Sequence, residues 1–141
     1  MAKVISAWIA SENLPNIKLP LYLDATETGW AKCLPQFDFI LLVNLLHLIS
    51  WNEMETLFNE LPKVLKKNGS AFVYGPFMRS GKLTSAGDQN FHTSLIKTDS
   101  VIGYKDDLDM LELFANSDLL HLETVEMPAN NLGFVLKNSL S

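Results

Sequence analysis

The sequence is poor in cysteine and in basic residues. Its single cysteine, Cys33, excludes an internal disulfide and fits a reducing compartment. Lysine and arginine number 11 against 16 acidic residues, which gives a net charge of −5. Because phosphate binding needs a basic patch, this balance argues against a nucleic-acid partner. We therefore expect a cytoplasmic protein that does not bind nucleic acid.

The sequence also lacks a hydrophobic run long enough to cross a membrane. The longest run, residues 37–49, is interrupted by Asn44 and His47 and is shorter than the about 20 residues that a transmembrane helix needs. The apolar stretch 4–10 is not followed by the cleavage site of a signal peptide. No metal site is expected either, because the histidines show no ligand spacing. They are His47, His92 and His121.

What is present indicates one packed domain over residues 1–141, with 48% apolar and 19% charged residues. Helical periodicity and capping signals predict helices over residues 3–13, 51–65, 88–97 and 106–116. Apolar runs predict strands over residues 19–23, 37–43, 70–73, 120–126 and 132–137. Strands that alternate with helices form a mostly parallel sheet, and the short final connection makes the last pair antiparallel. The expected fold class is a doubly wound α/β sheet that ends in a reversed strand.

Some of these elements carry more detailed signals. Ser50 and Glu53 have the spacing of a capping box, and Pro62 should kink or divide the helix that they start. Residues 66–69 read as the stop of that helix, with their lysines complementing its dipole. The apolar run 37–43 predicts a strand covered on both faces. Five aromatic residues are expected in the core: Trp8, Phe37, Phe39, Phe58 and Phe72.

Polar side chains follow three of the expected strands where each strand ends. They are Asn44 and His47, then Tyr74, then Asn130 and Asn131. In open α/β sheets, ligands bind outside the carboxyl ends of the parallel strands. The sequence therefore predicts that these side chains share one rim and that a small molecule binds there.

Each of these side chains also has a structural interpretation. His47 could act as a general base near neutral pH, or it could brace the following helix. Tyr74 could bind a ligand or pack on the loop 78–87. Asn130 and Asn131 could present amides to a ligand or serve their turn, since asparagine tolerates left-handed backbone. The catalytic residue is therefore unknown, with His47 as the candidate.

A set of motifs in a fixed order carries a family resemblance. The motifs are Ser6-Ala7-Trp8, Leu23-Asp24, Trp30, Asn44-x-x-His47-x-x-Ser50-Trp51, Tyr74-Gly75-Pro76-Phe77, Gly81, Thr84-Ser85, Phe91, Gly103, Asp106 and Met127-Pro-Ala-Asn-Asn131. They resemble an uncharacterised family of class I S-adenosylmethionine-dependent methyltransferase-like proteins, which includes the methyltransferase-like protein numbered twenty-six. The resemblance implies a Rossmann-like three-layer fold with a reversed last strand. It also implies a cofactor contact at Asp24, for which a capping role is the alternative.

The resemblance implies that a segment is missing as well. Relatives have an earlier strand and a glycine-rich loop that cradles the methionine part of the cofactor. Here the seven glycines are scattered, and no Gly-x-Gly occurs. Such loops need glycine because the backbone approaches the ligand closely. We therefore expect the chain alone to bind no cofactor, and S-adenosylmethionine only if the site is completed.

Two functions remain open from the sequence. The first is a small-ligand-binding or assembly module that is not a competent enzyme alone. The alternative is an S-adenosylmethionine-dependent methyltransferase of a small molecule, with its cofactor site completed by dimerisation or by a partner chain. A missing first strand would also leave residues 37–43 as an exposed edge. That edge should either pair with residues 19–23 or form a homodimer.

Overall fold

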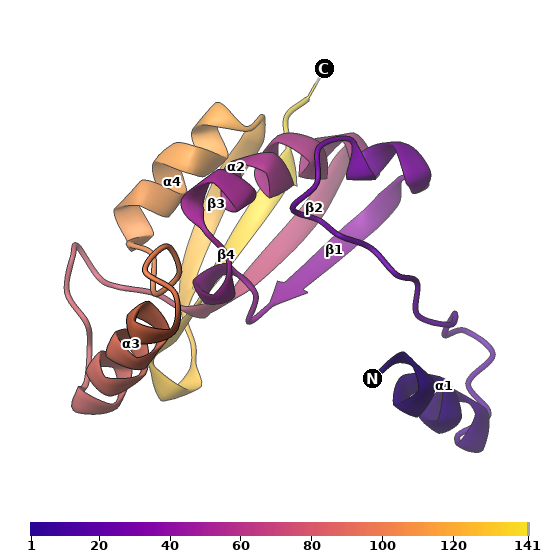
Figure 1. Ribbon diagram of the computed structural model, residues 1–141. Coiled ribbons are helices and arrows are strands. Elements are labelled where there is room, and N and C mark those ends of the chain that lie inside the picture. Colours follow the sequence, from indigo (N-terminus) through magenta and orange to yellow (C-terminus); the bar gives the residue numbers. More distant parts are fainter. Residues whose placement is uncertain (141) are drawn as a thin grey trace.

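The computed structural model describes residues 1–140, which form an α/β fold with one four-stranded sheet (Figure 1). The helices are α1 (Ala2–Ser11), α2 (Trp51–Glu60), α3 (Ala86–Thr98) and α4 (Asp107–Asn116), and the strands are β1 (Phe37–Val43), β2 (Leu65–Pro76), β3 (Leu119–Glu126) and β4 (Asn131–Asn138). The strand order is β1-β2-β4-β3, with β1 parallel to β2 and β4 antiparallel to both neighbours. The predicted fold class, with its reversed last strand, is confirmed. In the described part of the chain, no helix is long and apolar enough to span a membrane.

The core lies between the sheet and the two helices α2 and α4, which cover the same face (Figure 1). Phe134 of β4 is fully buried and meets the rings of Phe77 and Phe114 edge to face, at centroid distances of 5.0 and 5.3 Å. Phe58 of α2 meets Phe114 of α4 in the same way at 5.2 Å. Such pairs add to the stability that burial alone provides. This aromatic cluster holds the helix layer on the sheet.

The opposite face of β1 is open to solvent. Phe37, Phe39, Leu41 and Val43 expose 40%, 56%, 59% and 47% of their surface. The predictions that this strand is covered on both faces and that its two phenylalanines lie in the core are therefore wrong. The reason is that α2 and α4 both cover the other face of the sheet (Figure 1).

The N-terminal region forms a helix, α1, that lies apart from the sheet (Figure 1). None of its residues is buried, and Trp8 is 64% exposed, so the prediction that Trp8 lies in the core is wrong. The strand predicted at Leu19–Leu23 does not form, and its pairing with β1 is wrong as well. An extended segment becomes a strand only when a partner accepts its backbone hydrogen bonds, and here no ladder includes it.

The start of α2 follows the sequence signal. The Ser50 Oγ accepts a hydrogen bond from the Glu53 N–H at 3.3 Å, and the Glu53 carboxylate accepts one from the Ser50 N–H at 2.7 Å. This confirms the capping box. Helix α2 ends at Glu60, before the end of the predicted helix at residue 65, because Pro62 lies in a 3₁₀ turn that follows Glu60.

The segment 66–69 lies in β2 and does not end a helix, so that prediction is wrong. Asn68 adopts a φ of +62°, and the β1–β2 register shifts at this point. The shift accommodates an irregular start of the strand. Lys66 pairs with Asp38 of β1 at 2.9 Å instead of complementing a helix dipole.

Candidate ligand site at the rim of the sheet

The carboxyl ends of β1, β2 and β3 meet at one edge of the sheet, as the sequence predicted. The Asn44 N–H donates to the Tyr74 carbonyl at 2.9 Å, which joins the ends of β1 and β2. Pro76 at the end of β2 is paired with Asn131 at the start of β4. The polar motifs therefore lie side by side, while their role in binding stays a prediction.

His47 is the most unusual side chain at this rim. It is 7% exposed, and its Nδ1 has no hydrogen-bond partner among residues 1–140. The rings of Phe91 and Tyr104 meet its imidazole edge to face at 5.7 and 6.2 Å. Burial, assisted by the positive charge of Lys105, lowers the pKa of His47, which favours the neutral ring.

A buried polar atom without a partner costs about 1–3 kcal/mol. The His47 carbonyl accepts from the Gly103 N–H at 3.0 Å, but among residues 1–140 the imidazole Nδ1 makes no hydrogen bond to α2 or to any other element. The imidazole itself therefore keeps an unused hydrogen-bonding nitrogen.

Helix α3 is tied across the rim by Asp88. The Asp88 carboxylate accepts hydrogen bonds from the Ser85 hydroxyl at 2.6 Å, the Thr84 hydroxyl at 2.8 Å, the Tyr104 hydroxyl at 2.9 Å and the Asn130 amide at 3.1 Å. Burial raises the pKa of Asp88, but these four bonds outweigh it and leave the pKa below its ordinary value. Asn130 is thus part of a saturated network.

Sequence reasoning missed the roles of Asp88 and Tyr104. Ser85, which accepts from the Asp88 N–H at 3.1 Å, has the spacing of a helix N-cap and could have indicated Asp88 as a local partner. Nothing in the sequence indicated Tyr104, which reaches Asp88 from the loop after α3. Burial and the adjacent Asp88 carboxylate raise the pKa of Tyr104.

Lys105 makes two hydrogen bonds near the rim. Its Nζ donates to the carbonyl oxygens of Ile49 at 2.5 Å and Gly103 at 3.0 Å. Burial lowers the pKa of Lys105 to about 8, although the Glu53 carboxylate opposes this shift. The ammonium is thus used to hold two loops together.

Arg79 is engaged as well. Its guanidinium donates to the Phe77 carbonyl at 2.7 Å and the Asn130 carbonyl at 3.0 Å, and it pairs with Glu126 at 3.1 Å. The loop after β2 is thereby fastened to the turn between β3 and β4. Both basic side chains are thus held by groups of the chain itself.

The other predicted residues have local roles. Asp24 lies in the connector before β1, and its Oδ1 accepts bonds from the Thr26 hydroxyl at 2.6 Å and the Thr26 N–H at 2.9 Å, which lower the pKa of Asp24. The Asn131 amide donates to the Pro128 carbonyl within its turn at 3.0 Å. Tyr74 is half-buried. The described residues contain no cluster of three or more histidine, cysteine or acidic side chains that could hold a metal ion.

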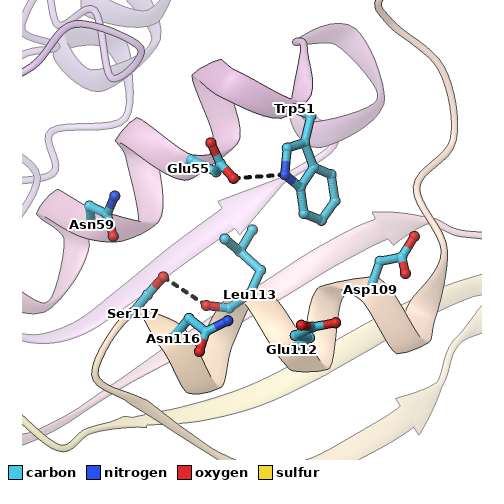
Figure 2. Close-up of a pocket in the computed structure, with 8 residues that line it drawn as sticks. All are labelled: Trp51, Glu55, Asn59, Asp109, Glu112, Leu113, Asn116 and Ser117. Atoms are coloured by element: carbon cyan, nitrogen blue, oxygen red, sulfur yellow. Dashed lines mark hydrogen bonds between the residues drawn. The ribbon is translucent and has the colours of Figure 1, made fainter.

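A separate cleft of about 420 Å³ lies between α2 and α4 (Figure 2). It is lined by Trp51, Glu55, Asn59, Asp109, Glu112, Leu113, Asn116 and Ser117. The Trp51 indole N–H donates to Glu55 at 2.9 Å, and the Ser117 hydroxyl donates to the Leu113 carbonyl at 2.7 Å. None of the sequence-predicted site residues lines this cleft, whose polar lining combines carboxylates with the amides of Asn59 and Asn116.

Solved structures with a similar fold include proteins described as methyltransferases. The mitomycin 7-O-methyltransferase matches with a TM-score of 0.79 and 14% identity over 97% of this chain and 39% of its own. Human N-acetylserotonin methyltransferase, solved in complex with SAM, matches at 0.71 and 12% identity over 94% of this chain and 38% of its own. An O-methyltransferase-like protein from Nostoc punctiforme matches with a TM-score of 0.66 and 19% identity. This match covers 74% of this chain and 32% of the Nostoc protein. At these identities, the matches show the Rossmann-like class I methyltransferase fold.

This chain therefore spans well under half the length of the solved structures that it matches, between 32% and 40%. A family model matches it almost from end to end, over residues 1–138. That model describes a family of unknown function, DUF938. The chain belongs to this DUF938 family and has part of the class I methyltransferase fold.

Proposed function

We propose that the rim of this chain binds a small, neutral molecule that carries a hydroxyl group. The supporting observation is the His47 imidazole, which is 7% exposed and keeps Nδ1 without a partner among the described residues. A ligand hydroxyl can donate to this nitrogen or accept from it, depending on the tautomer. Phe91, which contacts the imidazole and is 44% exposed, is the side chain that a ligand would displace.

The charges around His47 support a neutral ligand. Asp88 accepts four hydrogen bonds, and Lys105 donates to two carbonyl groups. Arg79 is paired with Glu126 and with two carbonyl groups. A charged ligand would have to break one of these arrangements, and replacing charge-assisted bonds is costly.

The fold implies S-adenosylmethionine as a cofactor, and the residues present do not fit it as a complete site. The family resemblance assigned the Asp24 carboxylate to the cofactor. Its Oδ1 already accepts two hydrogen bonds from Thr26. No Gly-x-Gly occurs in the 141 residues, so these residues offer no glycine cradle for the methionine part. We therefore propose that the chain alone is not a competent methyltransferase, and we derive no methyl-transfer step.

A second function is favoured by the comparisons. Three of the similar structures are described as O-methyltransferases or as a methyltransferase bound to SAM, and this chain spans only 32–39% of them. In this alternative, the chain methylates a small molecule after its cofactor site has been completed by a second copy or by another chain. His47 would then be the hydrogen-bonding group on the substrate side.

The ligand proposal can be tested by NMR with selective ¹⁵N labelling of the histidine rings. Phenol and cyclohexanol are neutral hydroxyl probes, and benzoate is an anionic probe of similar size. We expect saturable shifts of the His47 ring nitrogens with phenol or cyclohexanol, none with benzoate, and none at His121, which already contacts Thr124 at 2.8 Å. His47→Phe should abolish the binding. Equal responses of His47 and His121, or binding that survives His47→Phe, would contradict the proposal.

A further inference from the structure

The free edge of β1 is unprotected against pairing. Among the described residues, β1 pairs only with β2, so its other edge has free backbone donors and acceptors. Natural edge strands usually carry lysine, proline or a bulge that discourages pairing with another chain. The seven residues of β1 contain one charged residue, Asp38, and neither proline nor lysine. This edge can therefore accept another strand.

Apolar surface surrounds this edge. The outward side chains of β1, Phe37, Phe39, Leu41 and Val43, are between 40% and 59% exposed. Helix α1 also has an apolar side without cover, because Val4 and Trp8 are one turn apart and expose 59% and 64%. Exposed apolar patches such as these two mark interaction surfaces in soluble proteins.

We propose that a second copy of this chain occupies the β1 edge. The two β1 strands pair antiparallel about a twofold axis, and α1 of each copy covers the outward face of β1 in the other. Residues 12–29 join α1 to the folded part and, at about 3.3 Å per residue, span up to roughly 60 Å when extended. One symmetric contact thus buries the outward face of β1 and the apolar side of α1 in both copies.

The register of such a pair is favourable. If the strands pair around Ile40, Phe39 faces Leu41 of the other copy on the same side of the joined sheet. Asp38 then faces Leu42, and the two Asp38 side chains are separated along the strand, which avoids a like-charge contact. Asp38 also retains its ion pair with Lys66 at 2.9 Å.

The area available reaches the lower end of what a stable dimer needs. Aromatic side chains bury about 150–250 Å² each, so the exposed fractions of Trp8, Phe37 and Phe39 offer roughly 300 Å² per copy. The aliphatic side chains of α1 and β1 and the paired backbone add a comparable area. The total, roughly 600 Å² per copy, lies at the lower end of the range for a standard interface.

Sedimentation velocity over a dilution series from millimolar to submicromolar concentration tests the proposal on the intact chain. We expect a concentration-dependent species of twice the 15.8 kDa chain mass. Leu41→Lys should weaken dimerisation at least about tenfold, because it places two charges in the pair. The matched control is Leu120→Lys, since Leu120 lies on the same face at the opposite edge of the sheet and is similarly exposed, 52% against 59%.

Both leucines are exposed in the single chain, so neither substitution should unfold it, and circular dichroism with a melting curve checks this. Hydrogen exchange gives an independent readout, with protection of β1 amides that rises with concentration while β3 stays unchanged. A monomer at every concentration would overturn the proposal, and so would a dimer that Leu120→Lys weakens more than Leu41→Lys. Binding of phenol or cyclohexanol at His47 has no bearing on these outcomes, so the two proposals fail separately.

Discussion

At the scale of single residues, His47 and His92 lie in one aromatic cluster but differ in the hydrogen bonding of their Nδ1 atoms. This difference separates a structural role from a binding role. The His92 Nδ1 accepts from the Tyr104 N–H at 3.0 Å, whereas the His47 Nδ1 has no partner within residues 1–140. We predict that His47→Phe leaves the free energy of unfolding unchanged or raises it by about 1 kcal/mol, because an unmet polar atom is removed. His92→Phe should lower it by about 1–2 kcal/mol. Urea denaturation measures both, and a loss of about 2 kcal/mol in His47→Phe would mean that the imidazole braces the fold.

Lys105 predicts a pH dependence of stability. Its pKa is about 8 in the folded chain against an ordinary 10.5. Between these values the unfolded chain keeps a proton that the folded chain has released, so the free energy of unfolding rises with pH. Denaturation from pH 7 to 10.5 should show this rise in the original chain and in the control Lys97→Met, an exposed lysine, and lose it in Lys105→Met. The same slope in all three proteins would show that Lys105 is not its source.

At the scale of elements, the sequence predicted the features that depend on residues close together in the chain. It failed for the features that depend on contacts with distant parts of the chain. The bounds of β1, the capping box of Ser50 and the antiparallel last pair followed from residue patterns. The predicted strand 19–23 failed because no neighbouring strand accepts its hydrogen bonds. Residues 66–69 look like a helix stop, but they form the irregular start of β2. The rim could be predicted from strand ends, whereas the Asp88–Tyr104 contact joins residues 16 apart and left no local pattern.

The packing of β2 against β4 depends on the lack of a side chain at Gly133. A Cβ at Gly133 would lie 2.2 Å from Cζ of Phe72, whose ring covers this position on the neighbouring strand. We predict that Gly133→Ala destabilises the chain by about 1–3 kcal/mol through overpacking. Gly75→Ala, where the nearest atom is 3.7 Å away, should change stability by less than about 1 kcal/mol. Thermal unfolding measures both, and Phe72→Leu should relieve the defect of Gly133→Ala if the ring is its cause.

At the scale of the whole molecule, the chain combines a well-packed half with an open one. One face of the sheet is covered by α2 and α4, while the outward side of β1 is exposed and no residue of α1 is buried (Figure 1). The rim lies at the carboxyl ends of the strands, where open α/β sheets in general bind their ligands. The residues present supply polar groups there, but they supply no glycine cradle for a cofactor.

We propose that this chain binds a ligand at its rim and lacks a complete cofactor site. Isothermal titration of the purified chain with millimolar S-adenosylhomocysteine is the measurement to make first. We expect no saturable heat, while His47 still responds to phenol or cyclohexanol in the NMR titration. Saturable one-site binding of S-adenosylhomocysteine would overturn this proposal and would favour the methyltransferase alternative.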